Sequence, residues 1–342
     1  MKKYNIAILG CGAIFNRHLS AIENNSEFFK LVGLFDPIVQ LQAKYANELK
    51  VKAYLTEDDV YTDPEVNCIA ILTPNALHHH QALTAMANKK HVIIEKPATF
   101  LTRELNELIA SSQRNNVEIY SVLQVRLNPA IMIVKKALDI GLLGQVRSVS
   151  LVQRWQRPLS YFSGWRGNYE TGGGILREFG IHYLDILQFL VGMPQISCAN
   201  FFNTKFMATD VNDTIYGLLD FGGFGGSFEI SIAAEPQNLE CSLSIMTEKG
   251  FIKLGGKSLD EIITADFIDC ADKEKFDLIR NNINNEQTAN LAKQGASPYH
   301  PELYRQIVLN PKRFCLEETY NVIKLVEEVY KFKNSIPESK SN

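Results

Sequence analysis

The chain has 342 residues, of which 46% are hydrophobic and 21% are charged, and its formal net charge at pH 7 is −3. The composition is that of a globular protein, and the length predicts about two domains, each with its own core. The mild acidity argues against nucleic-acid and membrane partners, and no apolar stretch reaches the ~18 residues of a membrane span. Residues 6–9 are too short an apolar run for a signal peptide, and six cysteines without a CxxC pair indicate reduced thiols. We therefore expect a cytoplasmic protein.

In the first third of the chain, short apolar runs alternate with amphipathic stretches. The expected strands are 5–9, 31–35, 68–72, 92–94 and 119–122, and the expected helices are 13–24, 39–50, 77–87 and 102–115. Continuous apolar strands that alternate with helices are typical of a parallel sheet covered on both faces. Residues 1–122 are therefore predicted to form a doubly wound α/β domain of the Rossmann type.

The pattern changes after residue 122. Helices are expected at 129–140, 175–191, about 300–309 and 316–333, and extended segments at 146–155, 196–202, 214–221, 227–233, 239–246 and 251–254. Strands that follow one another without helices favour an antiparallel sheet. Residues 123–342 are therefore predicted to form an α+β domain with a large, mostly antiparallel open sheet. An open apolar face is a liability in water, so we expect it to pair with another subunit in a homodimer or homotetramer.

A nucleotide-binding turn is expected directly after the first strand. Gly10 and Gly12 allow a sharp turn and close approach of a pyrophosphate to the start of a helix, although Phe15 replaces the usual third glycine. Asp36 ends the second strand, where a carboxylate accepts hydrogen bonds from ribose hydroxyls and repels a 2′-phosphate. This arrangement favours NAD over NADP. The alternative for Asp36 is a solvated turn residue before Pro37.

Four motifs occur in a fixed order: GCGAIFNRH (10–18), TPNALH (73–78), EKP (95–97) and GGGILREFGIHYLDIL (172–187). In these motifs the chain resembles the glucose–fructose oxidoreductase/inositol dehydrogenase/MocA family. The resemblance implies that the EKP turn ends a parallel strand and directs Lys96 into a ligand cleft, where its ammonium group binds the reacting hydroxyl. A peptide bond before proline can be cis, which would form such a kink. The alternative is a lysine that caps the sheet edge through a surface salt bridge.

The resemblance also implies a set of cofactor-binding residues. They are Gly10, Gly12, Ala13, Ile14, Asp36, Thr73, Pro74, Asn75, His78, Glu95, Lys96, Trp165 and Arg166. The run His78-His79-His80 suggests a metal site, but successive helical residues point about 100° apart and cannot converge on one ion. No metal is therefore expected.

Glu178 and His182 are four residues apart on the expected helix 175–191 and so share a face. A carboxylate one turn away can hold the imidazole tautomer and support its protonated form, which suits His182 to accept a hydroxyl proton. Together with Lys96, these are the predicted catalytic residues. The family commonly has aspartate where Glu178 stands, and Asp185 is expected to be structural. An exposed or already satisfied Glu–His pair is the alternative.

Residues 153–166 interleave arginines with aromatic rings, which stack on sugars, while arginines bind phosphates. The alternative is an edge strand with amphipathic side chains. LQVRLNPAI (123–131), GWRGNYETGGGIL (164–176) and SPYHPELYRQI (297–307) resemble the family's nucleotide-sugar 3-dehydrogenases. These oxidise the C3 hydroxyl of UDP-N-acetylglucosamine, or of its uronate, with NAD, ahead of an aminotransferase that makes amino sugars for surface polysaccharide or lipid A.

This resemblance implies further residues beside the substrate. In addition to Lys96, Glu178 and His182, they are Gln124, Arg126, His300 and Tyr304. Helix capping and interdomain packing are the alternatives for these four, and no cation for a uronate carboxylate is identified. Two other functions stay open: a dehydrogenase of inositol or a simple sugar, and a non-catalytic sensor that binds a dinucleotide.

Overall fold

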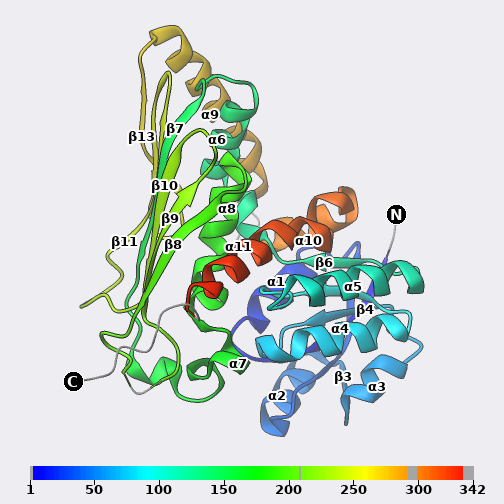
Figure 1. Ribbon diagram of the computed structural model, residues 1–342. Helices are drawn as coiled ribbons and strands as arrows, with labels where there is room; N and C mark the ends of the chain where they lie inside the picture. The colour runs from blue at the N-terminus through cyan, green and yellow to red at the C-terminus, as the bar shows by residue number, and fades with distance from the viewer. Residues whose placement is uncertain (1–2, 208, 292–298, 334–342) are drawn as a thin grey trace, which may run out of the picture. The chain divides into compact units, whose positions relative to one another are not determined.

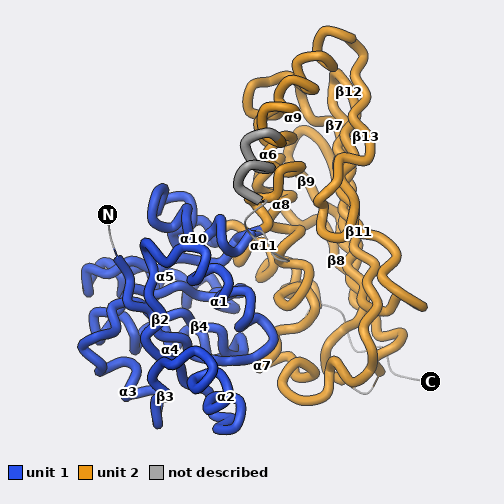
Figure 2. The backbone as a smooth tube through the Cα atoms, turned by 180° about the vertical axis from the view of Figure 1, so that it is seen from behind, with its two compact units in different colours: residues 1–124, 291–320 blue, residues 125–290, 321–342 orange. Residues whose placement is uncertain are grey.

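The computed structural model describes residues 3–207, 209–291 and 299–333 (Figure 1). The chain forms two compact units (Figure 2). The first unit comprises Met1–Gln124 and Leu291–Tyr320, and the second comprises Val125–Asn290 and Asn321–Asn342. The chain therefore passes from the first unit to the second and returns before it ends in the second.

The first unit is built on a six-stranded parallel sheet with the strand order β3-β2-β1-β4-β5-β6. Its strands are β1 Tyr4–Leu9, β2 Phe29–Phe35, β3 Lys52–Ala53, β4 Cys68–Ile71, β5 His91–Ile94 and β6 Ile119–Ser121. Its first helices are α1 Phe15–Glu23, α2 Val39–Leu49, α3 Glu57–Thr62, α4 His78–Ala87 and α5 Thr102–Asn115. Every residue of β4 is buried, as expected for a central strand with both faces covered. The predicted doubly wound α/β domain is confirmed.

Two short elements of this unit escape the sequence pattern. The strand β3 has only two residues, both exposed, so it leaves no apolar run to recognise. The helix α3 has six residues and is fixed by a capping box, in which Thr56 and Asp59 satisfy each other's backbone N–H groups. Local hydrogen bonding, more than hydrophobic periodicity, defines this part of the fold.

A late segment of the chain completes the first unit. Helix α10 (Tyr299–Leu309) packs against α1 and buries one face, and the turns η6 (Pro311–Phe314) and η7 (Leu316–Thr319) follow. Cys315 forms an isolated antiparallel bridge with Tyr120 at the edge strand β6. The sequence pattern assigns this segment to the domain 123–342, because no local pattern reveals packing against the start of the chain.

The second unit is built on a seven-stranded sheet with the order β13-β12-β11-β7-β10-β9-β8. Its strands are β7 Val146–Arg154, β8 Gln195–Phe202, β9 Thr214–Asp220, β10 Gly225–Ser231, β11 Glu240–Thr247, β12 Gly250–Gly255 and β13 Glu261–Phe267. Its main helices are α6 Pro129–Asp139, α8 Ile181–Val191, α9 Cys270–Leu291 and α11 Tyr320–Lys331. All neighbours are antiparallel except β7 and β10. The predicted mostly antiparallel sheet is confirmed.

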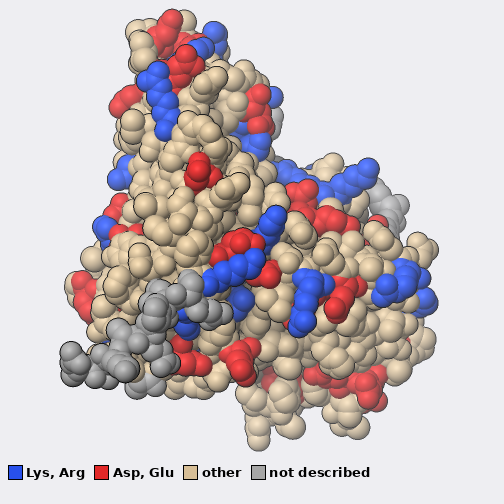
Figure 3. Space-filling view, in the orientation of Figure 1, with Lys and Arg blue, Asp and Glu red and all other residues tan. Residues whose placement is uncertain are grey.

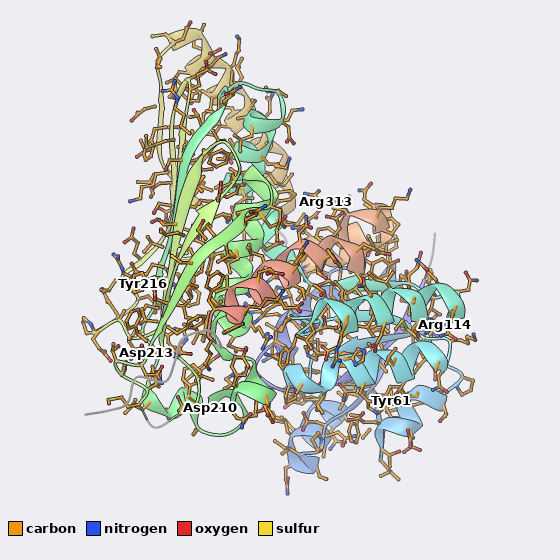
Figure 4. All side chains as sticks on the ribbon, viewed as in Figure 1. Tyr61, Arg114, Asp210, Asp213, Tyr216 and Arg313 are labelled. Atoms are coloured by element: carbon orange, nitrogen blue, oxygen red, sulfur yellow. The ribbon has the colours of Figure 1, made fainter. Side chains whose placement is uncertain are left out.

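This sheet has one covered and one open face. Helices α6 and α8 contact β12 and β7, respectively, and residues alternate between buried and exposed along β9. Tyr216 and Leu218 lie on the outer face and are 43% and 54% exposed, and Figure 4 shows Tyr216 on the side away from the helices. The exposed apolar side chains suit pairing with another subunit, which stays a prediction.

The helix expected at 175–191 is interrupted. Residues Leu176–Gly180 form a π-helical turn, and the α-helix α8 begins at Ile181. A short helix, α7 (Tyr169–Gly172), precedes this turn, and Gly173 and Gly174 follow it with φ angles of 80° and 77°. A Cβ at Gly174 would lie 2.5 Å from the Tyr330 hydroxyl, so glycine is needed there for both reasons. The π turn is of a kind frequent at functional sites.

No helix in the described parts of the chain has the length and apolarity to cross a membrane, and all six cysteines are thiols. On the face shown in Figure 3, basic and acidic side chains of the described residues are interspersed, with no large patch of one sign.

Candidate active site

The glycine-rich turn of the first unit leaves space for a ligand. Gly10 has a φ angle of 96°, and a Cβ there would lie 2.9 Å from the carbonyl group of Leu72. At Gly12, by contrast, no atom of the described residues comes within 4 Å of the position a Cβ would take. The turn leads directly into α1, whose N-terminus has no side-chain cap. A pyrophosphate fits here, at a helix start with an open approach over Gly12.

Asp36 fixes this turn from the end of β2. Its Oδ2 accepts a hydrogen bond from the Cys11 N–H at 2.7 Å, and its Oδ1 accepts one from Ile38 at 2.8 Å. The side chain is 7% exposed. Because a carboxylate offers about four lone-pair sites, two remain for ribose hydroxyls. The residues present therefore fit NAD, and Asp36 is more than a solvated turn residue.

His78 connects two turns that the sequence places near the cofactor. It is fully buried, with Nδ1 2.8 Å from the carbonyl oxygen of Pro97 and Nε2 2.9 Å from that of Thr73. Burial lowers the pKa of His78, and a neutral ring donates to one of the two oxygens. The contact between His78 and the cofactor stays a prediction, as it does for Thr73, Pro74 and Asn75.

Lys96 lies two residues after the end of β5, at the carboxyl end of a parallel strand. The Lys96–Pro97 peptide bond is cis, and the lysine side chain is partly exposed. The backbone N–H of Lys96 donates to Oε2 of Glu95 at 2.9 Å. The acid before the lysine therefore anchors the turn from within the unit.

Glu95 belongs to a buried polar cluster, which we call the Glu95 cluster and which also contains His18, His300 and Tyr304. Nε2 of His18 lies 2.9 Å from Oε1 of Glu95, and Nδ1 of His18 lies 2.8 Å from the Tyr304 hydroxyl oxygen. An ionised carboxylate only accepts hydrogen bonds, so Nε2 is the donor to Glu95. Nε2 of His300 lies 3.7 Å from the same Glu95 oxygen. Burial alone would raise the pKa of Glu95, but the two histidines outweigh it and hold that pKa well below its usual range.

Three of these residues were predicted to contact cofactor or substrate. Glu95, His300 and Tyr304 are 6%, 1% and 0% exposed, and all three are packed inside the first unit. Their ligand contacts stay predictions. The ligand atoms of His18, Glu95 and His300 lie within 4.8 Å of one another, but the His18–Glu95 distance is that of a direct hydrogen bond. His18 was given no role from sequence, although it ends the motif GCGAIFNRH.

In the second unit, Glu178 lies on the π-helical turn and is held by two donors. Its Oε1 accepts from the Tyr161 hydroxyl at 2.8 Å and from Nε of Arg166 at 3.2 Å. Burial raises the pKa of Tyr161, so its hydroxyl stays protonated and donates. The Arg166 guanidinium also lies 4.4 Å from the ring of Trp165. The structure thus brings together three predicted residues and adds Tyr161, an aromatic in the interleaved stretch 153–166.

His182 occupies the first turn of α8 and is partly exposed. Its ring lies edge-on to that of Tyr183, with 6.4 Å between centroids. Glu178 and His182 were expected to share a face because they are four residues apart on a regular α-helix. Glu178 instead lies on a π-helical turn, so this expectation does not apply to the pair. The predicted catalytic residues are divided between the units, with Lys96 in the first and Glu178 and His182 in the second.

Two further predicted substrate residues differ in their surroundings. Arg126 forms a bidentate ion pair with Asp185, with distances of 2.8 and 2.7 Å, and both are almost completely buried. This pair gives Asp185 the expected structural role and occupies one edge of the guanidinium. Oε1 of Gln124 is buried and accepts no hydrogen bond from the described residues. The substrate contacts of Arg126 and Gln124 stay predictions.

The fold and the glycine-rich turn define an oxidoreductase with a dinucleotide-binding domain. Residues 4–123 match the family described as oxidoreductase family, NAD-binding Rossmann fold, and residues 131–253 match the GFO/IDH/MocA C-terminal domain. The chain belongs to the Gfo/Idh/MocA family of oxidoreductases. The predicted family and the predicted cofactor, NAD, are confirmed.

Individual relatives are distant. An uncharacterized oxidoreductase of a Synechocystis species is 27% identical over 57% of this chain, and the match spans only 53% of that relative. Levoglucosan dehydrogenase of Pseudarthrobacter phenanthrenivorans is 24% identical over 81% of this chain and 80% of its own length. The WlbA dehydrogenase of Bordetella pertussis, solved with NADH and UDP-GlcNAcA, is 24% identical with a TM-score of 0.86, covering 98% of this chain and 97% of that one. At this sequence identity, the similarity to WlbA shows that the two chains share a fold.

Proposed function

We propose that the chain is an NAD-dependent dehydrogenase of a nucleotide-linked N-acetyl sugar, which oxidises the C3 hydroxyl of UDP-N-acetylglucosamine or of its uronate. The observation that carries this proposal is the anchored turn after β5, on which Glu95 holds the backbone of Lys96 while the lysine side chain stays partly exposed. An ammonium group at the carboxyl end of a parallel strand lies where α/β sheets bind their ligands.

The protein residues have separate tasks in this reaction. Lys96 donates a hydrogen bond to the reacting hydroxyl and stabilises the charge that develops on its oxygen. His182 accepts the hydroxyl proton, and Glu178 stabilises the imidazolium that results. NAD would supply the hydride acceptor, and Asp36 and the turn at Gly12 would hold its adenosine ribose and its pyrophosphate.

Two kinds of likeness support a nucleotide sugar. WlbA dehydrogenases of Bordetella pertussis and of Chromobacterium were solved with NADH and UDP-GlcNAcA, and their folds superpose on almost the whole of this chain. The motifs at 123–131, 164–176 and 297–307 resemble the same group of enzymes. The product, a 3-keto sugar, is a substrate for an aminotransferase, which places the enzyme in amino-sugar biosynthesis for surface polysaccharide or lipid A.

A dehydrogenase of a simple sugar or of inositol is the second candidate. It is favoured by the levoglucosan dehydrogenase match over 81% of this chain. A non-catalytic sensor is disfavoured, because it has no need of both Lys96 and His182.

The test is a substrate comparison. The purified chain is mixed with NAD and, in turn, with UDP-N-acetylglucosamine, its uronate, levoglucosan and myo-inositol, and NADH is followed by absorbance. We expect NADH to form with a nucleotide sugar and to be lost in Lys96→Ala. Turnover only with levoglucosan or inositol would replace the substrate class, and turnover that persists in Lys96→Ala would remove the role of the lysine.

A further inference from the structure

The guanidinium of Arg157 lies among aromatic rings of the second unit, just after β7. Its central carbon is 4.8 Å from the rings of Trp155 and Phe179 and 5.7 Å from the ring of Tyr161. Cation–π contacts of this kind hold a charged group in place while they leave its N–H edges available. Arg157 is partly exposed.

Arg157 has no acidic partner among the described residues. Its Nη1 donates to the carbonyl oxygen of Gln156 at 2.6 Å and, weakly, to Asn238 at 3.5 Å. No described residue accepts a hydrogen bond from Nε or Nη2, and neither atom is sealed from solvent. Arg154, three residues earlier, is paired with both Glu229 and Glu240.

An unpaired cation in this setting is unfavourable without a ligand. Burial lowers the pKa of Arg157, although a guanidinium stays charged in proteins. Desolvation of a charge is offset when an anion with matching hydrogen-bond geometry is bound. A carboxylate matches the planar fork of arginine, with two parallel N–H···O bonds.

The cation belongs to the same side-chain cluster as Glu178, one of the proposed catalytic residues. Tyr161, against which Arg157 packs, donates its hydroxyl to Glu178. Phe179, whose ring also contacts the guanidinium, follows Glu178 in the chain. The negative charge of Glu178 raises the pKa of Arg157 and so partly offsets the effect of burial. A group bound by Arg157 therefore lies near Glu178, the carboxylate that is proposed to support the proton acceptor.

We propose that Arg157 binds a carboxylate on the substrate sugar, so that the enzyme selects the uronate over the neutral N-acetylhexosamine. This inference rests on the proposed function. In a pyranose uronate only C4 separates C3 from C5, the carbon that bears the carboxylate, so a grip on the carboxylate orients the C3 hydroxyl. A neutral sugar leaves the guanidinium without a counterion, and sites with an unpaired polar group reject such analogues strongly.

The experiment measures binding as well as turnover. Dissociation constants for UDP-N-acetylglucosamine and its uronate are measured by calorimetry, with NADH present, for the parent, Arg157→Met and Arg157→Lys. We expect the parent to bind the uronate about tenfold to a hundredfold more tightly, as one charged hydrogen-bonded pair suggests. Arg157→Met should remove this preference and change affinity for the neutral sugar by less than about twofold, and Arg157→Lys should retain part of it.

Arg147→Met is the matched control. Arg147 is exposed on β7 and forms no ion pair with a described residue, so the variant removes the same charge from the same strand region. It should keep the full preference for the uronate. Thermal unfolding of each variant reports whether the aromatic packing around position 157 survives.

The outcomes separate the two proposals. Equal affinity of the parent for both sugars overturns the role of Arg157, whether or not the variants fold. If Arg157→Met loses affinity equally for both sugars, the role of Arg157 is overturned too. Such a result would mean that Arg157 contacts the diphosphate, which both sugars share, or that the variant is misfolded. A preference that depends on Arg157, without NADH formation from either sugar, would support carboxylate recognition and contradict the proposed dehydrogenase.

Discussion

The carboxylate of Glu95 and the imidazole of His18 form a buried hydrogen bond, with 2.9 Å between Oε1 and Nε2. The other carboxylate oxygen accepts the backbone N–H of Lys96. A single side chain thus connects helix α1 to the turn that carries the proposed catalytic lysine. We therefore predict that Glu95 is a positioning residue, and His18 and His300 hold its pKa well below the usual range.

The first prediction concerns Glu95→Gln. The amide has nearly the same shape but loses the charge that His18 and His300 stabilise, so the turn at Lys96 should loosen. We expect kcat to fall about tenfold to a hundredfold, as loss of charged hydrogen bonds suggests, while the KM for NAD changes little. Steady-state kinetics measure both quantities.

Glu48→Gln serves as the control for this variant, because Glu48 is exposed on α2. It should leave kcat unchanged. If Glu95→Gln changes only the melting temperature and not kcat, the cluster stabilises the fold without positioning the lysine.

The second prediction is an acid sensitivity of folding. Burial lowers the pKa of both His78 and His300. As pH falls below about 6.5, the unfolded chain takes up protons at these positions before the folded chain does, so the free energy of unfolding decreases. Each histidine contributes at most about 1.4 kcal/mol per pH unit.

Urea denaturation at several pH values between 7.5 and 5 measures this slope. His300→Gln should reduce it, because one of the two buried histidines is then absent. A free energy of unfolding that is constant from pH 7 to pH 5.5 would contradict the prediction.

The parts of the site that were predictable depend on local sequence. Gly10 and Asp36 follow directly after apolar strands, and Lys96 follows one residue later, after Glu95; a parallel sheet brings such strand ends to one edge. The structure keeps all three at these ends. The doubly wound domain was recognisable for the same reason, because β4, β5 and β6 are rich in apolar residues and helices separate them along the chain.

The Glu95 cluster was not predictable because its members are far apart in the chain. His18 and Glu95 are 77 positions apart, and His18 and Tyr304 are 286 apart. Their contact depends on α10 packing against α1, which no local pattern reports. The π-helical turn at Leu176–Gly180 was missed because the apolar residues around it suit an unbroken α-helix equally well.

The third prediction concerns cofactor choice through Asp36→Asn. Asparagine keeps an acceptor for a backbone N–H but removes the negative charge that would repel a 2′-phosphate. We expect the KM for NAD to rise by about tenfold, the equivalent of one hydrogen bond, and the NADP/NAD ratio of kcat/KM to increase. Kinetics with each cofactor test this, and an unchanged ratio would show that the charge of Asp36 does not select NAD.

The fourth prediction separates structure from substrate binding at Arg126. Removal of one partner from its buried ion pair with Asp185 leaves an uncompensated charge, so Arg126→Met and Asp185→Leu should each lower the free energy of unfolding by about 3–5 kcal/mol. The double variant should recover most of this loss, because an apolar pair can replace a buried ion pair. Chemical denaturation of the four proteins gives the coupling energy.

Activity of the double variant then decides the role of Arg126. If the arginine serves only to hold α8 near η2 (Gln124–Leu127), a restored fold restores kcat/KM as well. If Arg126 also contacts the substrate, as the sequence resemblance implies, stability returns without activity. Asp185 gives the matched comparison, because it is expected to be structural alone. A loss of kcat/KM in Arg126→Lys, measured under conditions where that variant is folded, would assign the arginine to the substrate.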